Sequence, residues 1–425
     1  MNYKEAIAYL NSFLNFENLP DAAFHTGNKD LQKFKGLLVK LGNPQKGYPI
    51  IHIAGTKGKG STAAILESIL VENGYKVGLY TSPHLVSVRE RVRLNRQMIS
   101  QEQFAGLIDQ IANAVSGEDE QGQPDTFRTV FEHLTAAGLL CFADEKVDVA
   151  IIETGLGGRL DATIVVEPIL SILTPIGLDH MAILGATVEE IASDKVHIIK
   201  QNVPSVSATQ LPAVNKIIQD RAQSVNSNLM IARNSVKFAN VNYNLDQLWF
   251  DLKCEVANGK KICLSLNGKF QLENLSTVLC ASNALKNLGF TIENSAVLRA
   301  LSSVEWEGRF QKVDSAPLVI LDGAHNQFAV ETVTESLKEQ FPNRHWRIVF
   351  STLRNKPWSE MLRILTEISP DIYIAPLQFT KTLDTKSYKT EIHKIASSAR
   401  LYDDAKTAFV AARSDAVGDE SVLVI

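Results

Sequence analysis

The chain has 425 residues, of which 45% are hydrophobic and 21% charged, and it carries a formal net charge of -4. At roughly 100 to 200 residues per domain, this length predicts two to three domains with cores of their own, and we start from two. A charge balance this close to neutral provides no field that could hold a polyanion, so we expect no nucleic acid binding as the main activity.

Neither a signal peptide nor a membrane span is expected. Residues 1–16 place charged side chains within a helical apolar pattern, unlike the basic and apolar regions of a leader. No apolar run reaches the length of about 18 residues that a membrane span needs. The cysteines are scattered and form no C-x-x-C pair, which indicates a cytoplasmic protein with buried thiols. They are Cys141, Cys254, Cys263 and Cys280.

From residue 50 onward, short β-branched runs alternate with helical patterns, which is typical of β-α-β units and a mainly parallel sheet. A helix is predicted over Ser61–Asn73, and Gly74 stands where its C-terminal stop is expected. A second helix is predicted at Thr187, where Glu190 completes a capping box, and Lys195 lies on its apolar face. The predicted strands are Ile50–Ala54, Val77–Thr81, Val147–Ile152 and Ile169–Thr174.

Three further segments complete the first part of the chain. Residues 116–125 are rich in Gly, Asp, Glu and Gln and are expected to form an exposed loop. Residues 236–266 alternate around Asn258-Gly259, a dipeptide that predicts a hairpin turn and therefore an antiparallel addition to the sheet. Leu272–Leu288 is predicted to be helical.

A second alternation of strands and helices begins near Pro317. We therefore place a domain boundary near residue 304, which divides the chain into residues 1–303 and 304–425. The predicted fold class is α/β, with a mainly parallel sheet in the first domain and a smaller α/β domain after it. The predicted strands of the second domain are Leu318–Leu321, Ile348–Phe350, Ile372–Ala375 and Val422–Ile425.

The strongest local signal is the run from Gly55 to Ser61, GTKGKGS, which follows a predicted strand and opens a predicted helix. Glycines let backbone N–H groups turn inward, the helix N-terminus adds positive potential, and a lysine supplies charge for terminal phosphates. The run departs from G-x-x-x-x-G-K-[ST], because Ile53 takes the first glycine position and Gly60 separates Lys59 from Ser61. A glycine turn with solvated lysines is the alternative, but the flanking strand and helix favour a nucleoside triphosphate site.

Three polar residues lie at or just past the ends of predicted strands, namely Ser82, Glu153 and His180. Ligands of open parallel sheets bind at this carboxyl edge. A hydroxyl, a carboxylate and an imidazole near phosphate oxygens could together hold Mg²⁺. Taken singly, each of these residues is more often a turn or loop residue. Their shared position after strands of one sheet favours the hypothesis that they bind Mg²⁺ together.

Lys195 is unusual because a lysine on an apolar helix face is costly to bury in its charged form. It must snorkel, pair with an acid, lose its proton or be chemically modified. Carbamylation by CO₂ would convert the ammonium group into an anion able to accept hydrogen bonds or to coordinate a metal. The spacing alone favours snorkelling.

In order and spacing, the chain resembles folylpolyglutamate synthases and dihydrofolate synthases, which are ATP-dependent amide-forming ligases of the Mur ligase superfamily. The resemblance covers nearly the whole chain, and its motifs are far more specific in combination than singly. The matching segments are Leu41 to Pro44, Gly55 to Ser61, Thr81 to Leu85, Glu153, Gly155 to Thr163, Gly177 to His180, Gln271, Asn274, Gly308-Arg309 and Asp322 to Asn326.

The resemblance implies a P-loop NTPase-like domain and a smaller C-terminal Rossmann-like domain, with the active site in the cleft between them. It also makes Lys195 a candidate for carbamylation, whereas the spacing alone favours snorkelling. The implied nucleotide-binding residues are Gly58, Lys59, Gly60, Ser61, Asn274, Arg309, Asp322 and His325. The implied magnesium ligands are Ser82, Glu153 and His180, and the implied pterin-side contacts are Thr129, Phe131 and Glu132. The candidate catalytic residues are Lys59, His180, Lys195 and Arg309.

The implied chemistry is amide formation through an acyl phosphate. ATP phosphorylates a carboxylate of a tetrahydrofolate-type substrate, and the amine of L-glutamate then attacks, with release of ADP and phosphate. Mg²⁺, Lys59 and Arg309 would neutralise charge on the transferring phosphoryl group. The expected cofactors are ATP and Mg²⁺, the latter at one or two sites, and a monovalent cation is a further candidate. We expect the chain to be a monomer.

Several positions depart from the family pattern and motivate two alternatives. One keeps the ligase chemistry but uses dihydropteroate, alone or in addition, or another carboxylate as the acceptor. The other is a divergent paralogue that binds nucleotide or folate without ligation. The departures are Lys57 and Ile164 in place of Asn, Val196-His197 in place of Ala-Gly, and Glu307 in place of Pro.

Overall fold

The computed structural model describes residues 1–15, 31–115, 129–244, 247–379 and 381–425, so the loop expected at residues 116–125 lies outside the described residues. The chain forms two compact units. The first unit comprises Met1–Ala239, Asp251–Ile262 and Leu272–Val304, and the second comprises Asn240–Phe250, Cys263–Gln271 and Glu305–Ile425. Among the described residues, no helix is both long and apolar enough to cross a membrane.

The first unit is built on an eight-stranded sheet, in the order β4-β3-β2-β5-β1-β6-β7-β8. The central strand β1 pairs in parallel with β5 and β6, and all five of its residues are buried. The two short strands β3 and β4 add an antiparallel edge beside β2. The strands are β1 (Ile50–Ala54), β2 (Val77–Tyr80), β3 (Val92–Leu94), β4 (Gln97–Met98), β5 (Val149–Glu153), β6 (Leu170–Leu173), β7 (Ser205–Ser207) and β8 (Leu229–Ile231). The predicted α/β class is confirmed.

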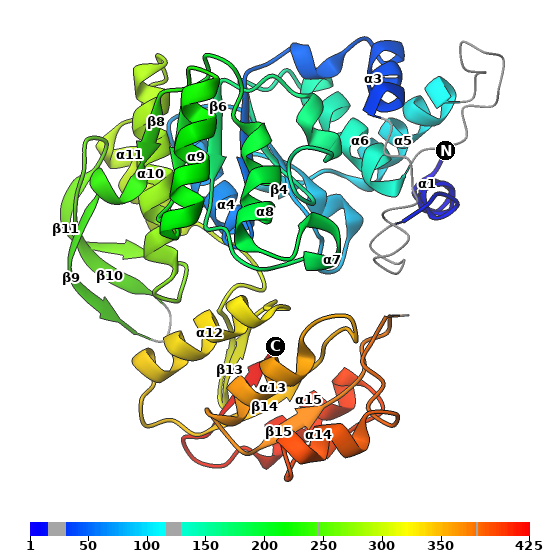
Figure 1. Cartoon of the computed structure of the whole chain (residues 1–425), viewed down its shortest axis with the longest axis vertical. Coiled ribbons are helices and arrows are strands. Elements are labelled where there is room, and N and C mark those ends of the chain that lie inside the picture. Colours follow the sequence, from blue (N-terminus) through cyan, green and yellow to red (C-terminus); the bar gives the residue numbers. More distant parts are fainter. Residues whose placement is uncertain (16–30, 116–128, 245–246, 380) are drawn as a thin grey trace. The chain divides into compact units, whose positions relative to one another are not determined.

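Helices cover both faces of this sheet (Figure 1). Side chains alternate along a strand, so Ile50 and Ala54 of β1 point to the same face of the sheet. Ile50 packs in the hydrophobic core beneath α5 and α6, and Ala54 packs in the core beneath α8 and α9. Helix α4 packs beside β2 and β5 and against α11. The helices are α1 (Tyr3–Asn11), α3 (Leu31–Lys40), α4 (Lys59–Glu72), α5 (Gln101–Val115), α6 (Val130–Asp144), α7 (Met181–Leu184), α8 (Val188–Lys195), α9 (Pro212–Ser224), α10 (Gln271–Asn287) and α11 (Asn294–Ser303).

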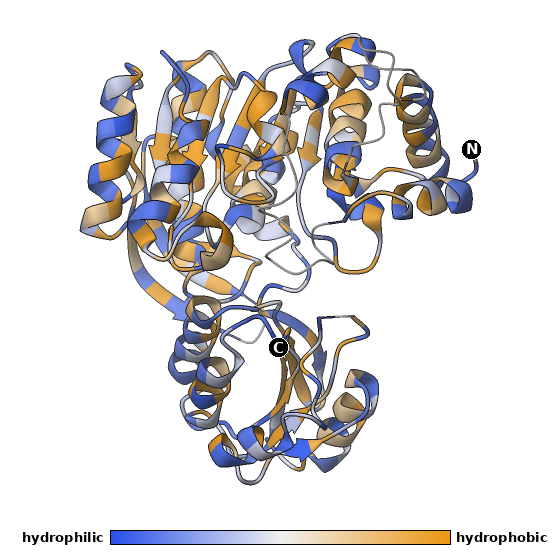
Figure 2. Cartoon of the chain, turned by 45° about the vertical axis from the view of Figure 1, so that its right-hand side comes forward, coloured by the Kyte–Doolittle hydropathy of each residue, from blue (hydrophilic) through white to orange (hydrophobic). Residues whose placement is uncertain are grey.

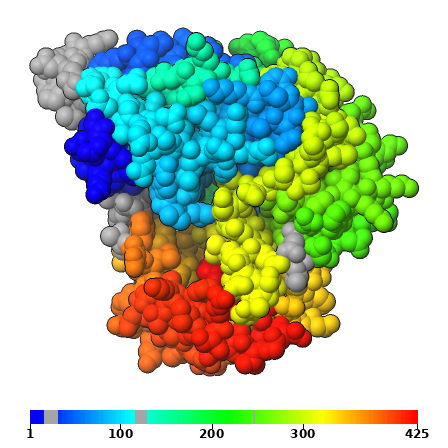
Figure 3. Space-filling view, turned by 180° about the vertical axis from the view of Figure 1, so that it is seen from behind, coloured from blue at the N-terminus to red at the C-terminus, as the bar shows by residue number. Residues whose placement is uncertain are grey.

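The N-terminal helix α1, dark blue in Figure 3, lies at the surface of the first unit. It packs against α5, and the amino group of Met1 donates a hydrogen bond of 2.9 Å to Asp109 of that helix. The capping box of Asn2 and Glu5 closes the first turn of α1. The beginning of the chain is therefore tied to the unit that holds the glycine-rich run.

A three-stranded sheet follows, in the order β11-β10-β9, with β9 (Lys237–Tyr243), β10 (Leu248–Lys253) and β11 (Asn258–Leu264). The prediction of a hairpin here is correct, but the strands form a sheet of their own rather than an addition to the main sheet, and the turn is not at Asn258-Gly259. The turn spans residues 254–257, closed by the hydrogen bond from Cys254 N to Ala257 O, and Asn258 begins β11. The N–H of Asn258 donates to Asn294 of α11 at 2.8 Å, so a tertiary contact outweighs the local turn preference.

The second unit contains a six-stranded sheet, in the order β12-β13-β17-β14-β15-β16, in which only β12 is antiparallel to its neighbour. Helices α12, α13 and α14 cover one face and α15 covers the other, and Figure 2 shows hydrophobic strands with hydrophilic outer helix surfaces. The strands are β12 (Gln311–Ser315), β13 (Leu318–Leu321), β14 (Trp346–Phe350), β15 (Ile372–Ile374), β16 (Arg400–Leu401) and β17 (Ser421–Val424). The helices are α12 (Gln327–Gln340), α13 (Trp358–Thr366), α14 (Lys389–Ile395) and α15 (Ala405–Asp415).

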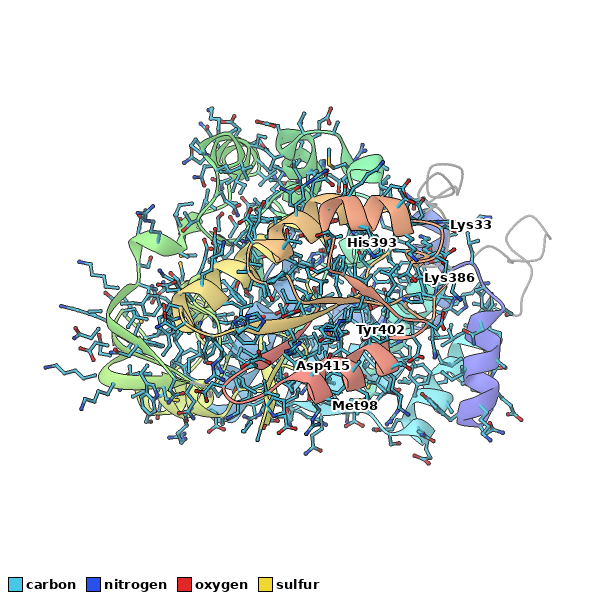
Figure 4. All side chains as sticks on the ribbon, turned by 90° about the horizontal axis from the view of Figure 1, so that it is seen from below. Lys33, Met98, Lys386, His393, Tyr402 and Asp415 are labelled. Atoms are coloured by element: carbon cyan, nitrogen blue, oxygen red, sulfur yellow. The ribbon has the colours of Figure 1, made fainter. Side chains whose placement is uncertain are left out.

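A polar network under α15 fixes the second sheet to that helix. Tyr373 of β15 donates its hydroxyl hydrogen to Asp415 at 2.7 Å and stacks on Tyr402 with 5.9 Å between the ring centroids. Tyr402 and Asp415 are both labelled in Figure 4. Arg347 donates to the Tyr373 hydroxyl and to Glu420. Burial raises the pKa of Tyr373 to about 12, so it stays a hydrogen-bond donor at neutral pH.

Candidate active site

The run from Gly55 to Ser61 connects β1 to α4, and the helix begins at Lys59, two residues earlier than expected. The N–H groups of Thr56 and Lys57 donate to the carbonyl of Pro175, at 2.9 and 3.3 Å. The Thr56 hydroxyl lies 3.0 Å from the carbonyl of Gly177. The run, which we call the phosphate loop, is thus fastened to the chain that follows β6 and opens directly into a helix N-terminus, as anion binding requires.

Gly58 and Asn274, both expected at a nucleotide site, lie side by side in the first unit. Gly58 has a φ of 79°, a backbone conformation that favours glycine. A Cβ atom built on Gly58 would overlap Oδ1 of Asn274, which is buried in the first turn of α10. The phosphate loop therefore touches α10, and there is no room for a side chain at that point.

We expect Gly58→Ala to weaken binding of a non-hydrolysable ATP analogue by about tenfold or more. The left-handed backbone would cost about 1–2 kcal/mol, and the overlap with Asn274 would move the loop. Isothermal titration calorimetry measures the affinity. The matched control is Gly106→Ala in α5, where a Cβ meets nothing within 4 Å, so binding should be unchanged there. Equal binding by the two variants would contradict the role given to the loop.

Lys59, Ser82 and Glu153 also come together in the first unit. Glu153 is the last residue of β5 rather than the residue after it, and it is 4% exposed. Its Oε1 lies 3.7 Å from Nζ of Lys59, and its Oε2 accepts the N–H of Ser82 at 3.3 Å. This buried carboxylate thus lies at the carboxyl edge of the parallel strands, where ligands of such sheets bind.

Lys195 ends α8 and is 5% exposed, so snorkelling, which the spacing alone favoured, is wrong for this lysine. Burial and then the positive charge of Lys59 lower the pKa of Lys195 to about 7, against the opposing effect of Asp179, Asp194 and Asp161. The neutral amine of Lys195 is therefore accessible near neutral pH, unlike that of an exposed lysine. A neutral amine is the form that reacts with CO₂ to give a carbamate.

The acids around Lys195 were not predicted from the sequence. Asp161 and Asp179 come from two separate loops, and Asp194 precedes the lysine in α8. Asp194 accepts the N–H of Gly158 at 2.7 Å, and a Cβ on Gly158 would lie 2.8 Å from the Lys195 carbonyl oxygen. Residues 155–160, which we call the glycine loop, thus pack directly on the end of α8. In the sequence, Asp194 beside Lys195 and Asp161 in the glycine-rich segment Gly155 to Thr163 could have indicated that acids lie near this lysine.

His180 precedes α7 and has a φ of 50°. Its side chain is 39% exposed, and Nε2 lies 3.8 Å from a carboxylate oxygen of Asp179. Among the described residues, no group of three or more His, Cys, Asp and Glu side chains is arranged to hold a metal ion. The convergence of His180 with Ser82 and Glu153 stays a prediction.

The expected pterin-side residues lie at the start of α6. Thr129 and Glu132 form a capping box, in which each side chain accepts the backbone N–H of the other, at 3.1 and 2.7 Å. The ring of Phe131 covers Gly155, where a Cβ would overlap it. Thr129 and Glu132 therefore stabilise the first turn of α6, while Phe131 packs against the glycine loop. A contact of these residues with a pterin stays a prediction.

Arg309, Asp322 and His325 belong to the second unit and cluster around the end of β13. The buried carboxylate of Asp322 accepts the N–H groups of Phe310 and Ala324, at 2.7 and 2.8 Å. Burial raises the pKa of Asp322, an effect that the nearby Arg309 opposes. A Cβ on Gly323 would overlap Nη1 of Arg309, and Nδ1 of His325 lies 3.0 Å from the Gly323 carbonyl. These three residues are thus held together within their own unit.

Comparisons with known proteins match nearly the whole chain to one family. Residues 53–282 match the model of the Mur ligase middle domain, and residues 308–425 match that of the Mur ligase glutamate ligase domain. The chain is 38% identical over 387 residues to a dihydrofolate synthase/folylpolyglutamate synthase of Bacillus subtilis, covering 89% of this chain and 86% of that protein. It is 32% identical over 421 residues to a protein of the same name from Escherichia coli, covering 99% and 93%.

Solved structures show the same similarity. A Mycobacterium tuberculosis folylpolyglutamate synthase complexed with ADP and AMPPCP has a TM-score of 0.87 and 27% identity, covering 99% of this chain and 96% of that chain. A complex of FPGS with AMPPCP and folate has a TM-score of 0.85 and 27% identity, covering 100% and 96%.

Proposed function

Because this chain belongs to the folylpolyglutamate synthase/dihydrofolate synthase family of the Mur ligase superfamily, we propose that it adds L-glutamate to a tetrahydrofolate-type substrate at the expense of ATP. The observation in the molecule that best supports this proposal is the half-buried Lys59 of the phosphate loop, which lies 3.7 Å from the buried Glu153 and lowers the pKa of the buried Lys195. Such a set suits the handling of phosphate and carboxylate groups.

The reaction has two steps in this proposal. A carboxylate oxygen of the folate attacks the γ-phosphorus of ATP, the bond to the ADP oxygen breaks, and an acyl phosphate forms. The amine of glutamate then attacks the acyl carbon, phosphate leaves, and the amine loses a proton. Lys59, at the N-terminus of α4, is the chain's own positive charge for the transferring phosphoryl group.

Magnesium fits the residues at the carboxyl edge of the first sheet. Glu153 provides a buried carboxylate, which accepts a hydrogen bond from the backbone N–H of Ser82. The two residues lie at the ends of adjacent strands, β5 and β2. Their carboxylate and hydroxyl groups are oxygen ligands of the kind that Mg²⁺ prefers. We propose Ser82, Glu153 and His180 as its ligands. Bound there, the ion would draw electron density from the phosphate oxygens of ATP.

We propose that Lys195 is carbamylated during turnover. Its lowered pKa supplies the neutral amine that CO₂ requires, and the positive charge of Lys59, which helps to lower that pKa, would attract the resulting anion. The carbamate would exchange a buried cation for an anion beside Lys59. An acidic carbamate could then contact a metal ion or orient the incoming amine.

The remaining assignments extend the proposal. Arg309, Asp322 and His325, with Gly58, Gly60, Ser61 and Asn274, are proposed to bind ATP, and Phe131 with Thr129 and Glu132 to border the pterin. The domain division at residues 1–303 and 304–425, a monovalent cation, a monomeric state and a cytoplasmic location are likewise proposed. The location is supported by four free cysteines.

Dihydropteroate is the second candidate acceptor. The relatives from Bacillus subtilis and Escherichia coli carry both names, dihydrofolate synthase and folylpolyglutamate synthase. We therefore propose that this chain also glutamylates dihydropteroate.

The departures from the family pattern do not disturb the fold around the site. Ile164 and Val196 pack into the core under α8 and α9, and Nδ1 of His197 lies 3.0 Å from the carbonyl oxygen of Asp194. Glu307 is exposed. These contacts show that the departing residues are accommodated in the fold, and the assay below distinguishes a ligase from a paralogue that binds ligands without ligation.

The test is a coupled assay of ADP release with tetrahydrofolate, dihydropteroate and a panel of amino acids. We expect ADP release only when a folate-type acceptor and L-glutamate are both present. Release with another carboxylate in place of the pterin substrates would overturn the substrate assignment. Tight binding of an ATP analogue and folate without any product would favour the non-ligating alternative.

A further inference from the structure

His52 is a buried histidine that the proposed reaction leaves without a task. It lies in the middle of β1, and its side chain is 0% exposed. Its Nε2 is 2.9 Å from the hydroxyl oxygen of Thr163, a residue of the short helix η3 (Ala162–Val165). The Thr163 hydroxyl lies in turn 2.5 Å from Oδ1 of Asp161. A histidine inside the central sheet is thereby linked to an acid of the glycine-rich motif.

The direction of these hydrogen bonds follows from the groups themselves. The Asp161 carboxylate only accepts, so the Thr163 hydroxyl donates to it and must accept from Nε2–H of His52. Burial, and then the charge of Lys200, lowers the pKa of His52 to about 3, so the ring is neutral and carries a single proton. That proton is on Nε2, because Nδ1 is buried without a hydrogen-bond partner.

Asp161 connects the Thr163 hydroxyl to the glycine loop through hydrogen bonds. Its Oδ2 accepts the N–H of Leu156 at 2.8 Å, while Oδ1 also accepts the N–H of Thr163 at 3.0 Å. From the other side, Asp194 accepts the N–H of Gly158 at 2.7 Å. The loop is thus held between two carboxylates, one oriented from the sheet and one on α8, and it packs on Lys195.

We propose that His52 is a positioning residue, which acts through Thr163 and Asp161 to hold the glycine loop and the carboxylate of Asp161 in place beside Lys195. This inference rests on the proposed ligase function for its kinetic consequence, but its structural part does not. Removing the donor on His52 leaves Thr163 free to turn its hydroxyl away from Asp161. The glycine loop then loses the fixed acceptor for Leu156.

The experiment compares His52→Gln with His52→Leu. The amide nitrogen of glutamine can take the position of Nε2 and donate to Thr163, whereas leucine cannot. We expect His52→Leu to lower kcat by about 10- to 100-fold with the KM for ATP changed by less than about twofold, and His52→Gln to stay within about threefold of the parent chain. Hydrogen exchange of the peptide spanning residues 154–161 should be about tenfold faster in His52→Leu and unchanged in His52→Gln.

Two further variants keep the test decisive if His52→Leu folds poorly. Thr163→Val has nearly the same shape, breaks the same link and should reproduce both effects. Tyr48→Phe removes another buried hydrogen bond, from the Tyr48 hydroxyl to Leu139 O at 2.8 Å. It should lower the melting temperature while leaving kcat and loop exchange unchanged.

Two results would overturn the proposal. One is an equal loss of kcat in His52→Gln and His52→Leu. The other is loop exchange in Thr163→Val that matches the parent chain. A parent chain without ligase activity would instead refute the proposed function, and the exchange measurement would still decide the role of His52.

Discussion

Lys59→Ala is expected to lower kcat for ADP release by about 1,000-fold, because in the proposed reaction it removes the positive charge at the start of α4 that faces the transferring phosphoryl group. The fold should persist, since two electrostatic changes oppose each other. Glu153 loses a cation at 3.7 Å, while Lys195 loses the like charge that helps to lower its pKa. We expect the free energy of unfolding to change by no more than about 2 kcal/mol, as measured by urea denaturation.

Lys57→Asn is the matched control within the same loop. Lys57 donates its backbone N–H to Pro175, which the substitution keeps, and its side-chain charge acts on Glu273 of α10. We expect kcat to change by less than about tenfold. If Lys57→Asn were as damaging as Lys59→Ala, the loop would need its total charge rather than one directed lysine.

Lys195→Met is expected to reduce ligase activity by at least about 100-fold, because methionine fills the same space but can neither be carbamylated nor carry a charge. The parent chain should lose activity in CO₂-depleted buffer near pH 7 and regain it with bicarbonate, and ¹³C-bicarbonate should give a carbamate signal that Lys195→Met lacks. An active parent chain with an unmodified Lys195 at ambient CO₂ would refute the carbamate.

The same substitution should change how stability depends on pH. The folded-state pKa of Lys195, about 7, lies below its ordinary value of 10.5, so the unfolded chain binds more protons between these values. The contribution of Lys195 to stability therefore rises with pH across this window, and its burial cost is complete below about pH 7. Denaturation in CO₂-depleted buffer should show the advantage of Lys195→Met over the parent chain falling by about 2 to 4 kcal/mol from pH 7 to 10. An advantage independent of pH would contradict the lowered pKa.

The strands β1, β2, β5 and β6 were predictable because buried parallel strands are continuous apolar runs, whereas the short strands β3, β4, β7 and β8 were not predicted. Ile50–Ala54 was located correctly to the residue, and the predicted helix near Thr187 begins at its capping box. The turn at Asn258-Gly259 failed, since a contact of Asn258 with Asn294, 36 positions away, decides the local geometry. Local turn chemistry cannot anticipate a partner in another helix.

The sequence predicted which residue types belong to the candidate site, but it predicted less of how their side chains are arranged in space. The position of Ser82 and Glu153 at strand ends indicated that they would meet, because parallel strands share one carboxyl edge. Burial and the charge of Lys59 lower the pKa of Lys195, while Asp161 and Asp179 from other loops oppose this effect, and none of these contacts is local in the sequence. The link from His52 to Thr163 spans 111 positions and leaves no local signal.

The central claim is that this chain forms an amide through an acyl phosphate, and transfer of oxygen tests it most directly. The enzyme is given ATP, L-glutamate and a folate whose terminal carboxylate carries ¹⁸O, and the phosphate and folate products are analysed by mass spectrometry. We predict one ¹⁸O atom in each phosphate released, with equal amounts of ADP and glutamylated folate. Phosphate without ¹⁸O, or ADP formed without glutamylated product, would contradict the account.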